Sequence, residues 1–366
     1  MSIFEVPLER LRQRGSIKWR RYEPDVLPLF VAEMDADLAP AVAQRLQRAI
    51  AEGDTGYPEL PTYQEAMIDY AQWQWGWDFN VSEASLVTDV VTGMREVILA
   101  VTEPGDAVVI NPPIYPPFRA VCAGRRIVEV PVAEGRLDLV GLEAAFEAQR
   151  PAAYLLCSPH NPSGAVHTLE ELTQVAALAQ RYQVTVVSDE IHAPLAGAGH
   201  TPYLKVPGAR GAYIVTSASK SWNLAALKAG LVIGAKADLA KLSPMAADGA
   251  SYFGILAHAT ALSEGRQWLA QARAETAANK EFFAAELARQ LPALHYVPSE
   301  GTYLAFLDCS PLGLADPAEH FHQVGRVRFN PGAAFSAAAA QYVRVNLATS
   351  QEIIAEAVAR MAASVA

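Results

Sequence analysis

The chain has 366 residues, 51% of them hydrophobic, which is enough for one large domain or two linked domains with a sizeable core. Its formal net charge of −10 argues against non-specific binding to nucleic acids or anionic membranes. The three cysteines are widely spaced, no apolar run has membrane length, and the start lacks a signal-peptide core. We therefore expect a soluble, cytoplasmic protein without a disulfide framework, a zinc pattern or a membrane span.

The N-terminal part, residues 1–45, is expected to form an arm and a loop rather than a compact unit. A helix should begin at Pro40, because proline suits a first helical turn and apolar residues then recur at helical spacing. Gly53 should end this helix, and residues 64–75 predict the next one. The tyrosines and tryptophans between Tyr63 and Trp77 are interpreted as core or domain-interface residues and are assigned no chemistry.

From about residue 85 the pattern becomes α/β, and Gly93 is expected to open a helix that runs to Val101. Strand-like runs follow at 107–110, 127–132, 153–157, 184–188, 212–215 and 231–233. They are rich in Val, Ile and Leu without clean alternation, which predicts a mainly parallel central sheet covered on both faces. Thr168 and Glu171 have capping-box spacing and predict a helix that ends near Tyr182.

The C-terminal part predicts a second, smaller domain. One long helical stretch over 257–290 should link to it, and strand-like runs at 301–307 and 342–346 precede a final helix capped by Ser350. We therefore predict three parts. They are an N-terminal arm over 1–45 that packs with the small domain, a large domain over 46–285, and a small α+β domain over 286–366.

The clearest candidate for chemistry is Lys220, in a Ser217-Ala-Ser219-Lys220 segment that follows the apolar run 212–215. Short hydroxyl side chains can donate to phosphate oxygens, and a partly desolvated lysine amine attacks an aldehyde. Phosphate and aldehyde together indicate pyridoxal phosphate. The alternative is a solvated lysine at the end of a strand.

Other candidates include Asn161 and Asp189, which lie near the ends of strands, where α/β sheets bind ligands, and Arg344, which lies within the strand-like run 342–346. Asp189 could bond a pyridinium nitrogen, or could simply cap a turn. Asn161 could donate to a phenolic oxygen, although Asn-Pro-Ser-Gly is also turn chemistry. His192 could be an ordinary loop histidine. Arg344 could bind a carboxylate in bidentate fashion, or lie at the surface of an edge strand. Gly93 could let backbone N–H groups approach an anion, or belong to a plain loop.

The order of Asn161-Pro-x-Gly, Asp189, Ser-x-Ser-Lys220 and Arg344-x-Asn resembles the fold-type I pyridoxal-phosphate aminotransferases of class I/II, over nearly the whole chain. This resemblance implies the α/β fold of aspartate aminotransferase-like PLP-dependent transferases. It implies that Lys220 carries the cofactor, that Asp189 holds the pyridinium, that Asn161 donates to the phenolic oxygen and that Arg344 binds the substrate α-carboxylate.

The same resemblance implies further contacts with the cofactor. Tyr115 would stack on its ring, and His192 stands where the family usually has a tyrosine. Lys228 stands where many members have a phosphate-binding arginine. The phosphate cup would consist of Gly93, Met94, Ser217 and Ser219. Tyr57 would reach the phosphate of a neighbouring subunit, which implies a homodimer with shared sites.

Several motifs resemble the MalY/PatB group of carbon–sulfur lyases, among them Lys18-Trp19, Ser188-Asp-Glu-Ile-His192 and the segment from Leu27 to Asp35. Glu33 and Ser163 depart mildly from that group. The resemblance implies a PLP-dependent cystathionine β-lyase of amino-acid metabolism and methionine biosynthesis, which yields a thiol, pyruvate and ammonia. An aminotransferase shares all these residues and stays an alternative. A regulatory or interaction protein that keeps the fold is an alternative of another class.

Overall fold

The computed structural model describes residues 2–133 and 135–366, and this part of the chain divides into two compact units. Unit 1 contains the N-terminal residues up to Asp37, Asn161–Gly164 and Trp268–Ala366. Unit 2 contains Leu38–His160 and Ala165–Gln267. These boundaries differ from those expected at 45 and 285. Helix α3 (Pro40–Glu52) packs against α11 (Tyr252–Glu264) inside unit 2, and α12 (Arg266–Gln290) belongs almost wholly to unit 1.

Unit 2 is built on a central sheet with the strand order β2-β8-β7-β6-β5-β3-β4. Its strands are β2 (Ala84–Val87), β3 (Ala107–Ile110), β4 (Arg126–Glu129), β5 (Ala153–Cys157), β6 (Thr185–Asp189), β7 (Tyr213–Thr216) and β8 (Gly230–Ile233). Strand β8 is antiparallel to both of its neighbours, and the other pairs are parallel. The expected mainly parallel sheet is therefore confirmed.

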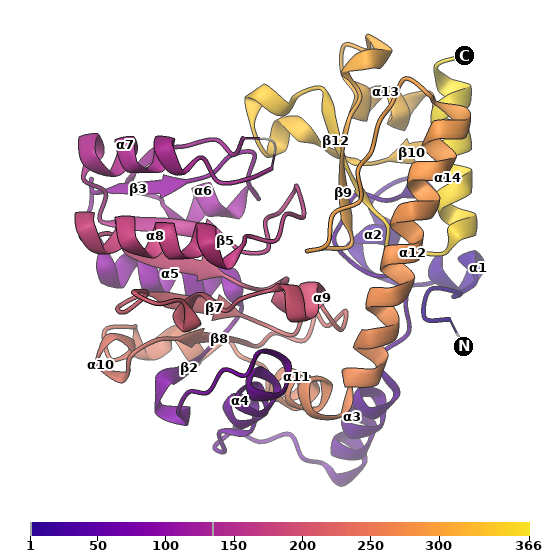
Figure 1. Cartoon of the computed structure of the whole chain (residues 1–366). Helices are drawn as coiled ribbons and strands as arrows, with labels where there is room; N and C mark the ends of the chain where they lie inside the picture. The colour runs from indigo at the N-terminus through magenta and orange to yellow at the C-terminus, as the bar shows by residue number, and fades with distance from the viewer. Residues whose placement is uncertain (1, 134) are drawn as a thin grey trace. The chain divides into compact units, whose positions relative to one another are not determined.

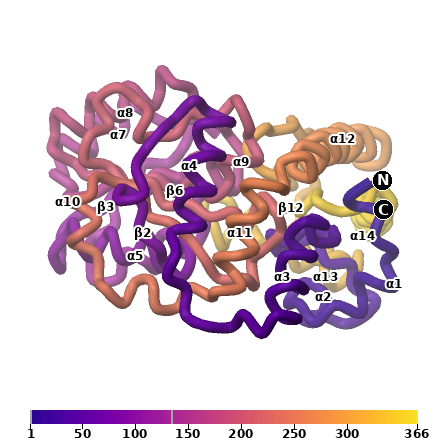
Figure 2. Tube along the Cα trace, turned by 90° about the horizontal axis from the view of Figure 1, so that it is seen from below, coloured from indigo at the N-terminus to yellow at the C-terminus, as the bar shows by residue number. Residues whose placement is uncertain are grey.

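Helices cover both faces of this sheet. Figures 1 and 2 show α7 (Leu139–Gln149) and α8 (Leu169–Tyr182) on one face and α5 (Val90–Val101) on the other. The remaining helices of unit 2 are α3, α4 (Thr62–Trp75), α6 (Pro117–Val121), α9 (Ala193–Ala196), α10 (Lys236–Leu239) and α11. Because side chains are covered on both faces, β3, β5 and β7 are buried along their whole length.

Local sequence signals set several helix ends as expected. Helix α3 ends at Gly53, which adopts the left-handed conformation with φ 69°. Thr168 and Glu171 form both bonds of a capping box at the start of α8. Ser350 accepts a hydrogen bond from the Ile353 N–H at the start of α14 (Gln351–Ser364).

The single long helix expected over 257–290 is wrong, because the chain forms α11 and α12 separated by Gly265. The Gly265 carbonyl accepts a hydrogen bond of 2.9 Å from Trp222 Nε1. A Cβ at Gly265 would lie 2.5 Å from the Ala261 oxygen and 2.6 Å from Trp222 Nε1. The break therefore depends on a close approach by a residue that is distant in the sequence.

Unit 1 contains a small antiparallel sheet with the order β11-β12-β9 and a parallel pair β1-β10. These strands are β1 (Leu27–Pro28), β9 (Leu304–Asp308), β10 (Val327–Arg328), β11 (Asn330–Pro331) and β12 (Tyr342–Asn346). Its helices are α1 (Leu8–Leu11), α2 (Ile17–Arg20), α12, α13 (Pro317–Gln323) and α14. Short 3-10 turns of the two units are Val81–Glu83, Gly197–Gly199, Tyr203–Lys205, Pro244–Ala247, Ser310–Leu312, Gly332–Ala334 and Ala337–Ala339.

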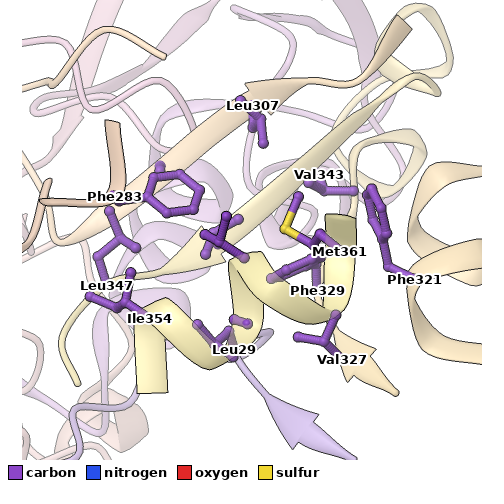
Figure 3. Close-up of a cluster of buried hydrophobic side chains, with 14 of the residues drawn as sticks. Leu29, Phe283, Leu307, Phe321, Val327, Phe329, Val343, Leu347, Ile354 and Met361 are labelled. Atoms are coloured by element: carbon purple, nitrogen blue, oxygen red, sulfur yellow. The ribbon is translucent and has the colours of Figure 1, made fainter. Parts of the chain in front are cut away.

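The core of unit 1 joins its N-terminal and C-terminal segments. Figure 3 shows Leu29 from the N-terminal segment near Ile354 and Met361 of α14, within a cluster that includes Phe283 of α12 and Val343 of β12. This burial explains why the first residues of the chain belong to the same unit as the last. No helix in the described part of the chain is long and apolar enough to cross a membrane.

Candidate active site

Three parallel strands of unit 2 place polar residues at one edge of the sheet. Cys157 at the end of β5 pairs with Asp189 at the end of β6, and Asp189 pairs with Val215 of β7. Asp189 is buried, and its Oδ1 accepts a hydrogen bond of 3.0 Å from the Ile191 N–H. Burial raises the pKa of Asp189 to about 7, and the charge of Glu190 adds to this, whereas the Lys220 charge acts to lower it. Asp189 and Lys220 therefore interact electrostatically.

Lys220 lies in a compact turn that follows β7. The Trp222 N–H donates to the Ala218 carbonyl at 3.1 Å, and the Leu224 N–H donates to the Ser219 carbonyl at 2.8 Å. Trp222 is completely buried, and its bond to Gly265 fastens the far side of the turn. Lys220 itself is only partly buried. The turn therefore presents the lysine amine from a rigid, well-packed base.

The two serines before Lys220 have different surroundings. Ser217 is buried, and its hydroxyl donates to the Ala229 carbonyl at 2.8 Å and accepts the Ser219 N–H at 3.2 Å. Its hydrogen is thus used within the loop. Ser219 is partly exposed. Of the two, Ser219 is the better candidate to donate to a ligand.

The start of α5 corrects the expected role of Gly93. Helix α5 begins at Val90, and the Gly93 N–H donates to the Asp89 carbonyl at 2.8 Å, so this amide is used inside the first turn. A Cβ at Gly93 would lie 2.7 Å from Val215 Cγ1, so the glycine is needed for packing against β7. Met94 is completely buried in the core.

The N–H groups of α5 that have no acceptor within the helix lie before Gly93. A helix offers no intrahelical acceptor to its first N–H groups, which here are those of Val90 and Val91. The helix dipole makes this end attractive to anions. Lys228 Nζ lies 2.8 Å from Asp89 Oδ2, and its side chain is about half exposed. A positive side chain therefore lies beside the start of α5.

Three other predicted residues of unit 2 lie on loops or short turns. His192 is buried and directly precedes α9, where its carbonyl accepts the Leu195 N–H. Tyr115 is partly buried and packs against the core of the unit in the connection from β3 to α6. Tyr57 is 102% exposed in the connection from α3 to α4. The side chain of Tyr57 is therefore fully available at the surface of this chain.

Two predicted residues belong to unit 1 and contact each other. Arg344 lies on β12, the middle strand of its sheet, and is only 3% exposed, so the surface-arginine alternative is wrong. Its Nη1 donates to Asn161 Oδ1 at 3.0 Å, and its Nη2 donates to the Phe30 carbonyl at 3.3 Å. The guanidinium also lies 4.8 Å from the ring centroid of Phe335. The side chain is thus held on several sides.

The segment before α3 is held by a buried ion pair. Lys18 Nζ lies 2.7 Å from Asp35 Oδ2, and both side chains are completely buried. The same Nζ donates to the Glu33 carbonyl at 3.1 Å, and that carbonyl also accepts a hydrogen bond of 2.6 Å from Asn346 Nδ2. The motif residues Lys18 and Asp35 therefore order the chain that lies beside β12.

Sequence reasoning missed two residues behind the Lys220 turn. The Ala218 N–H donates to the Tyr63 hydroxyl at 3.3 Å, and His258 Nδ1 lies 3.2 Å from the same oxygen. The sequence indicates Tyr63 only as a core or domain-interface aromatic. No local signal could have identified the pair, because Tyr63 and His258 are 195 positions apart in the chain.

Comparisons with known proteins concern the family and the fold of the chain. The model of the family "Aminotransferase class I and II" matches residues 24–361. A Mycobacterium tuberculosis H37Rv protein with the provisional name cystathionine beta-lyase is 45% identical over 395 aligned positions, covering 98% of this chain and 97% of that protein. Cystathionine beta-lyase PatB of Bacillus subtilis strain 168 is 31% identical over 385 positions, covering 99% of each chain.

A solved structure has the same fold. The crystal structure of a Corynebacterium diphtheriae protein, provisionally described as a PLP-dependent beta-cystathionase, has a TM-score of 0.95 and 33% identity. The match covers 100% of this chain and 99% of that one. The expected fold and the resemblance drawn from the motifs are confirmed. The chain belongs to the aminotransferase class I and II family.

Proposed function

We propose that the protein is a PLP-dependent carbon–sulfur β-lyase that converts cystathionine or related cysteine thioethers to a thiol, pyruvate and ammonia. One observation carries the proposal. Asp189 is a buried carboxylate that interacts with the Lys220 turn, in a chain whose full-length relatives include proteins named cystathionine beta-lyase.

The residues of unit 2 fit pyridoxal phosphate. When bound, this cofactor supplies an aldehyde that condenses with amines and a ring that accepts electron density. A protonated ring nitrogen would supply the opposite charge that stabilises ionised Asp189, whose pKa burial raises to about 7. The N–H groups of Val90 and Val91, the Ser219 hydroxyl and the Lys228 ammonium offer the donors and positive charge that a phosphate group needs.

Further cofactor contacts are part of the proposal. Tyr115 offers an aromatic face for stacking on the ring. His192 and Asn161 are proposed donors to the phenolic oxygen. Asn161 Oδ1 accepts from Arg344, and Nδ2 is the donor group of this side chain. Met94 is a residue of α5, and its side chain packs in the core of unit 2.

The chain's own residues then divide the work of the reaction. The Lys220 amine acts as general base and takes the proton from the substrate Cα, which a partly buried amine on a rigid turn can do at short range. Arg344 binds the substrate α-carboxylate through a fork-like pair of N–H···O bonds. Asp189 stays ionised, and its negative charge would favour a proton on the ring nitrogen of the cofactor. The bond between Cβ and sulfur then breaks with its electron pair on sulfur, and the proton that Lys220 took from Cα can pass to this thiolate to give the thiol. The remaining enamine is hydrolysed by water to pyruvate and ammonia.

An aminotransferase is the second candidate, because the family includes both reactions and both need the same proton removal. A lysine or arginine committed to a side-chain carboxylate would favour transamination of dicarboxylic amino acids, and we assign none. The test is product analysis with cystathionine. We expect homocysteine, pyruvate and ammonia in continuous turnover without a keto acid. Turnover that stops after one equivalent and resumes only when a keto acid is added would overturn the lyase proposal.

We also propose a homodimer in which Tyr57 contacts the phosphate bound by the other subunit. A fully exposed tyrosine on a surface connection supports this role. Mixing inactive Lys220→Ala protein with an inactive Tyr57 variant should restore activity through hybrid sites, whereas an active, stable monomer would contradict the idea. A cytoplasmic location is proposed because Cys122, Cys157 and Cys309 are buried thiols.

A further inference from the structure

Two helices of unit 2 bring polar side chains to the back of the Lys220 turn. Tyr63 lies on α4 and His258 on α11, and both are buried. Their rings meet edge to face, with centroids 5.3 Å apart. The two helices pack against each other, so the pair is part of a rigid wall rather than a loop. The Tyr63 hydroxyl and His258 Nδ1 both lie within hydrogen-bond distance of residues just before Lys220.

Tyr63 and His258 lie within hydrogen-bond distance of Ser217 and Ala218, the residues at the start of the Lys220 turn. The Ala218 N–H donates to the Tyr63 hydroxyl at 3.3 Å. His258 Nδ1 lies 3.2 Å from that hydroxyl and 3.4 Å from Ser217 Oγ. Because the Ser217 hydrogen is already donated to Ala229, His258 Nδ1 accepts the Tyr63 hydrogen or, when it carries the ring hydrogen, donates to Ser217 or Tyr63. Nδ1 therefore connects α11 to the turn directly through Ser217 or by way of the Tyr63 hydroxyl, which accepts the Ala218 N–H.

The side chains of Tyr63 and His258 are both uncharged near neutral pH. Burial lowers the pKa of His258 to about 4, and burial raises the pKa of Tyr63 well above its ordinary value. Neither group therefore competes with Lys220 for a proton or a ligand charge near neutral pH. Their effect on the turn acts through geometry alone.

We propose that Tyr63 and His258 are positioning residues for Lys220, and this inference rests on the proposed function. Lys220 lies inside the helical turn from Ala218 to Trp222, which the Trp222 N–H closes onto the Ala218 carbonyl. Trp222 fastens one end of that turn to Gly265, and Tyr63 fastens the other end through the Ala218 N–H. A lysine held at both ends of its turn meets an aldehyde in one orientation, which speeds the condensation.

The test measures how fast Lys220 becomes modified, without measuring turnover. Cofactor-free wild-type and Tyr63→Phe proteins are mixed with pyridoxal phosphate, reduced with borohydride at timed intervals, and digested for mass spectrometry. Tyr63→Phe removes the acceptor of a buried N–H, so we expect the rate constant for modification of Lys220 to fall about three- to tenfold. Tyr213→Phe is the matched control. Like Tyr63, Tyr213 is buried and its hydroxyl makes a hydrogen bond to the backbone, in this case to the Asp238 carbonyl. Tyr213→Phe should change the rate constant for modification of Lys220 by no more than about twofold.

A second pair of variants separates positioning from loss of stability. His258→Asn keeps a polar group near Nδ1 and should retain most of the wild-type rate, whereas His258→Leu should slow it as Tyr63→Phe does. Circular-dichroism melting shows that each variant compared is folded. Equal rates in wild type, Tyr63→Phe and His258→Leu would overturn this inference alone. If the wild-type adduct forms on Lys228 or another lysine, the proposed role of Lys220 fails first.

Discussion

The buried ion pair between Lys18 and Asp35 should be far more important for stability than the exposed pairs near it. Lys18→Met keeps most of the apolar stem of the side chain but removes the charge. Asp35 would then be a buried carboxylate that keeps one side-chain donor, Trp19 Nε1 at 3.0 Å. Arg10→Met breaks the pair Arg10–Asp37, whose N–O distance is 2.6 Å and whose side chains are 59% and 53% exposed. Both changes replace the cation of an ion pair by methionine, but at different burial, and Asp37 keeps Arg14 as a second partner at 3.4 Å.

The magnitudes follow from desolvation. Removing one partner of a buried pair costs about 3–5 kcal/mol, because the remaining charge has no counter-charge. An exposed pair contributes about 0–1 kcal/mol, because water already solvates both charges. Since a urea m-value is about 1–3 kcal/mol per M, Lys18→Met should lower the unfolding midpoint of unit 1 by roughly 1–5 M. Arg10→Met should change it little.

The assay is urea unfolding of the cofactor-free protein, followed by far-UV circular dichroism at low and high salt. Added salt should reduce the effect of Arg10→Met and leave that of Lys18→Met nearly unchanged. The double variant Lys18→Met/Asp35→Leu should recover part of the loss, because no buried charge remains. If Lys18→Met costs no more than Arg10→Met, the reasoning about desolvation is refuted.

Three further predictions concern other parts of the chain. The pKa of Asp189 is about 7 in the folded protein and near 4 when unfolded, so the folded state binds an extra proton between these pH values. Cofactor-free wild type should therefore lose stability relative to Asp189→Asn as pH rises from 4 to 7, by a few kcal/mol in urea unfolding; a constant difference would exclude the shift. Gly164→Ala should lower the melting temperature more than Gly53→Ala, because both have positive φ but only the Gly164 Cβ meets an atom, Ser299 Oγ at 2.1 Å. Arg344→Ala should lower kcat/KM roughly 30- to 5,000-fold, which corresponds to a loss of about 2–5 kcal/mol, and a wild type equally active on amines without the carboxylate would argue against this role.

Signals within a few residues of each other were enough to predict much of the fold. The Thr168 cap bonds a residue three positions away, and Gly53 ends α3 through its own backbone conformation. The strands β3, β5 and β12 have the bounds expected from their apolar runs. These features need no partner from elsewhere in the chain, so the local sequence contains all the information that they require.

Features that depend on distant partners could not be predicted in the same way. The break at Gly265 depends on Trp222, and the placement of Gly93 depends on the close approach of Val215. For that reason the expected single helix and the expected opening role of Gly93 were both wrong. Motif order still predicted the family correctly and pointed to Lys220 and Asp189 as candidates, because the order of residues along a chain can be read without knowledge of their contacts.

The sequence by itself therefore determined the mainly parallel sheet, several helix ends, the family and the candidate lysine. Tertiary structure alone decided that Arg344 is buried on a middle strand, that Lys18 pairs with Asp35, and that Tyr63 and His258 support the Lys220 turn. The physical reason is the range of the interactions. A cap or an apolar period acts over a few residues, whereas Arg344 bonds the Phe30 carbonyl 314 positions away, and only the folded chain brings such groups within hydrogen-bond distance.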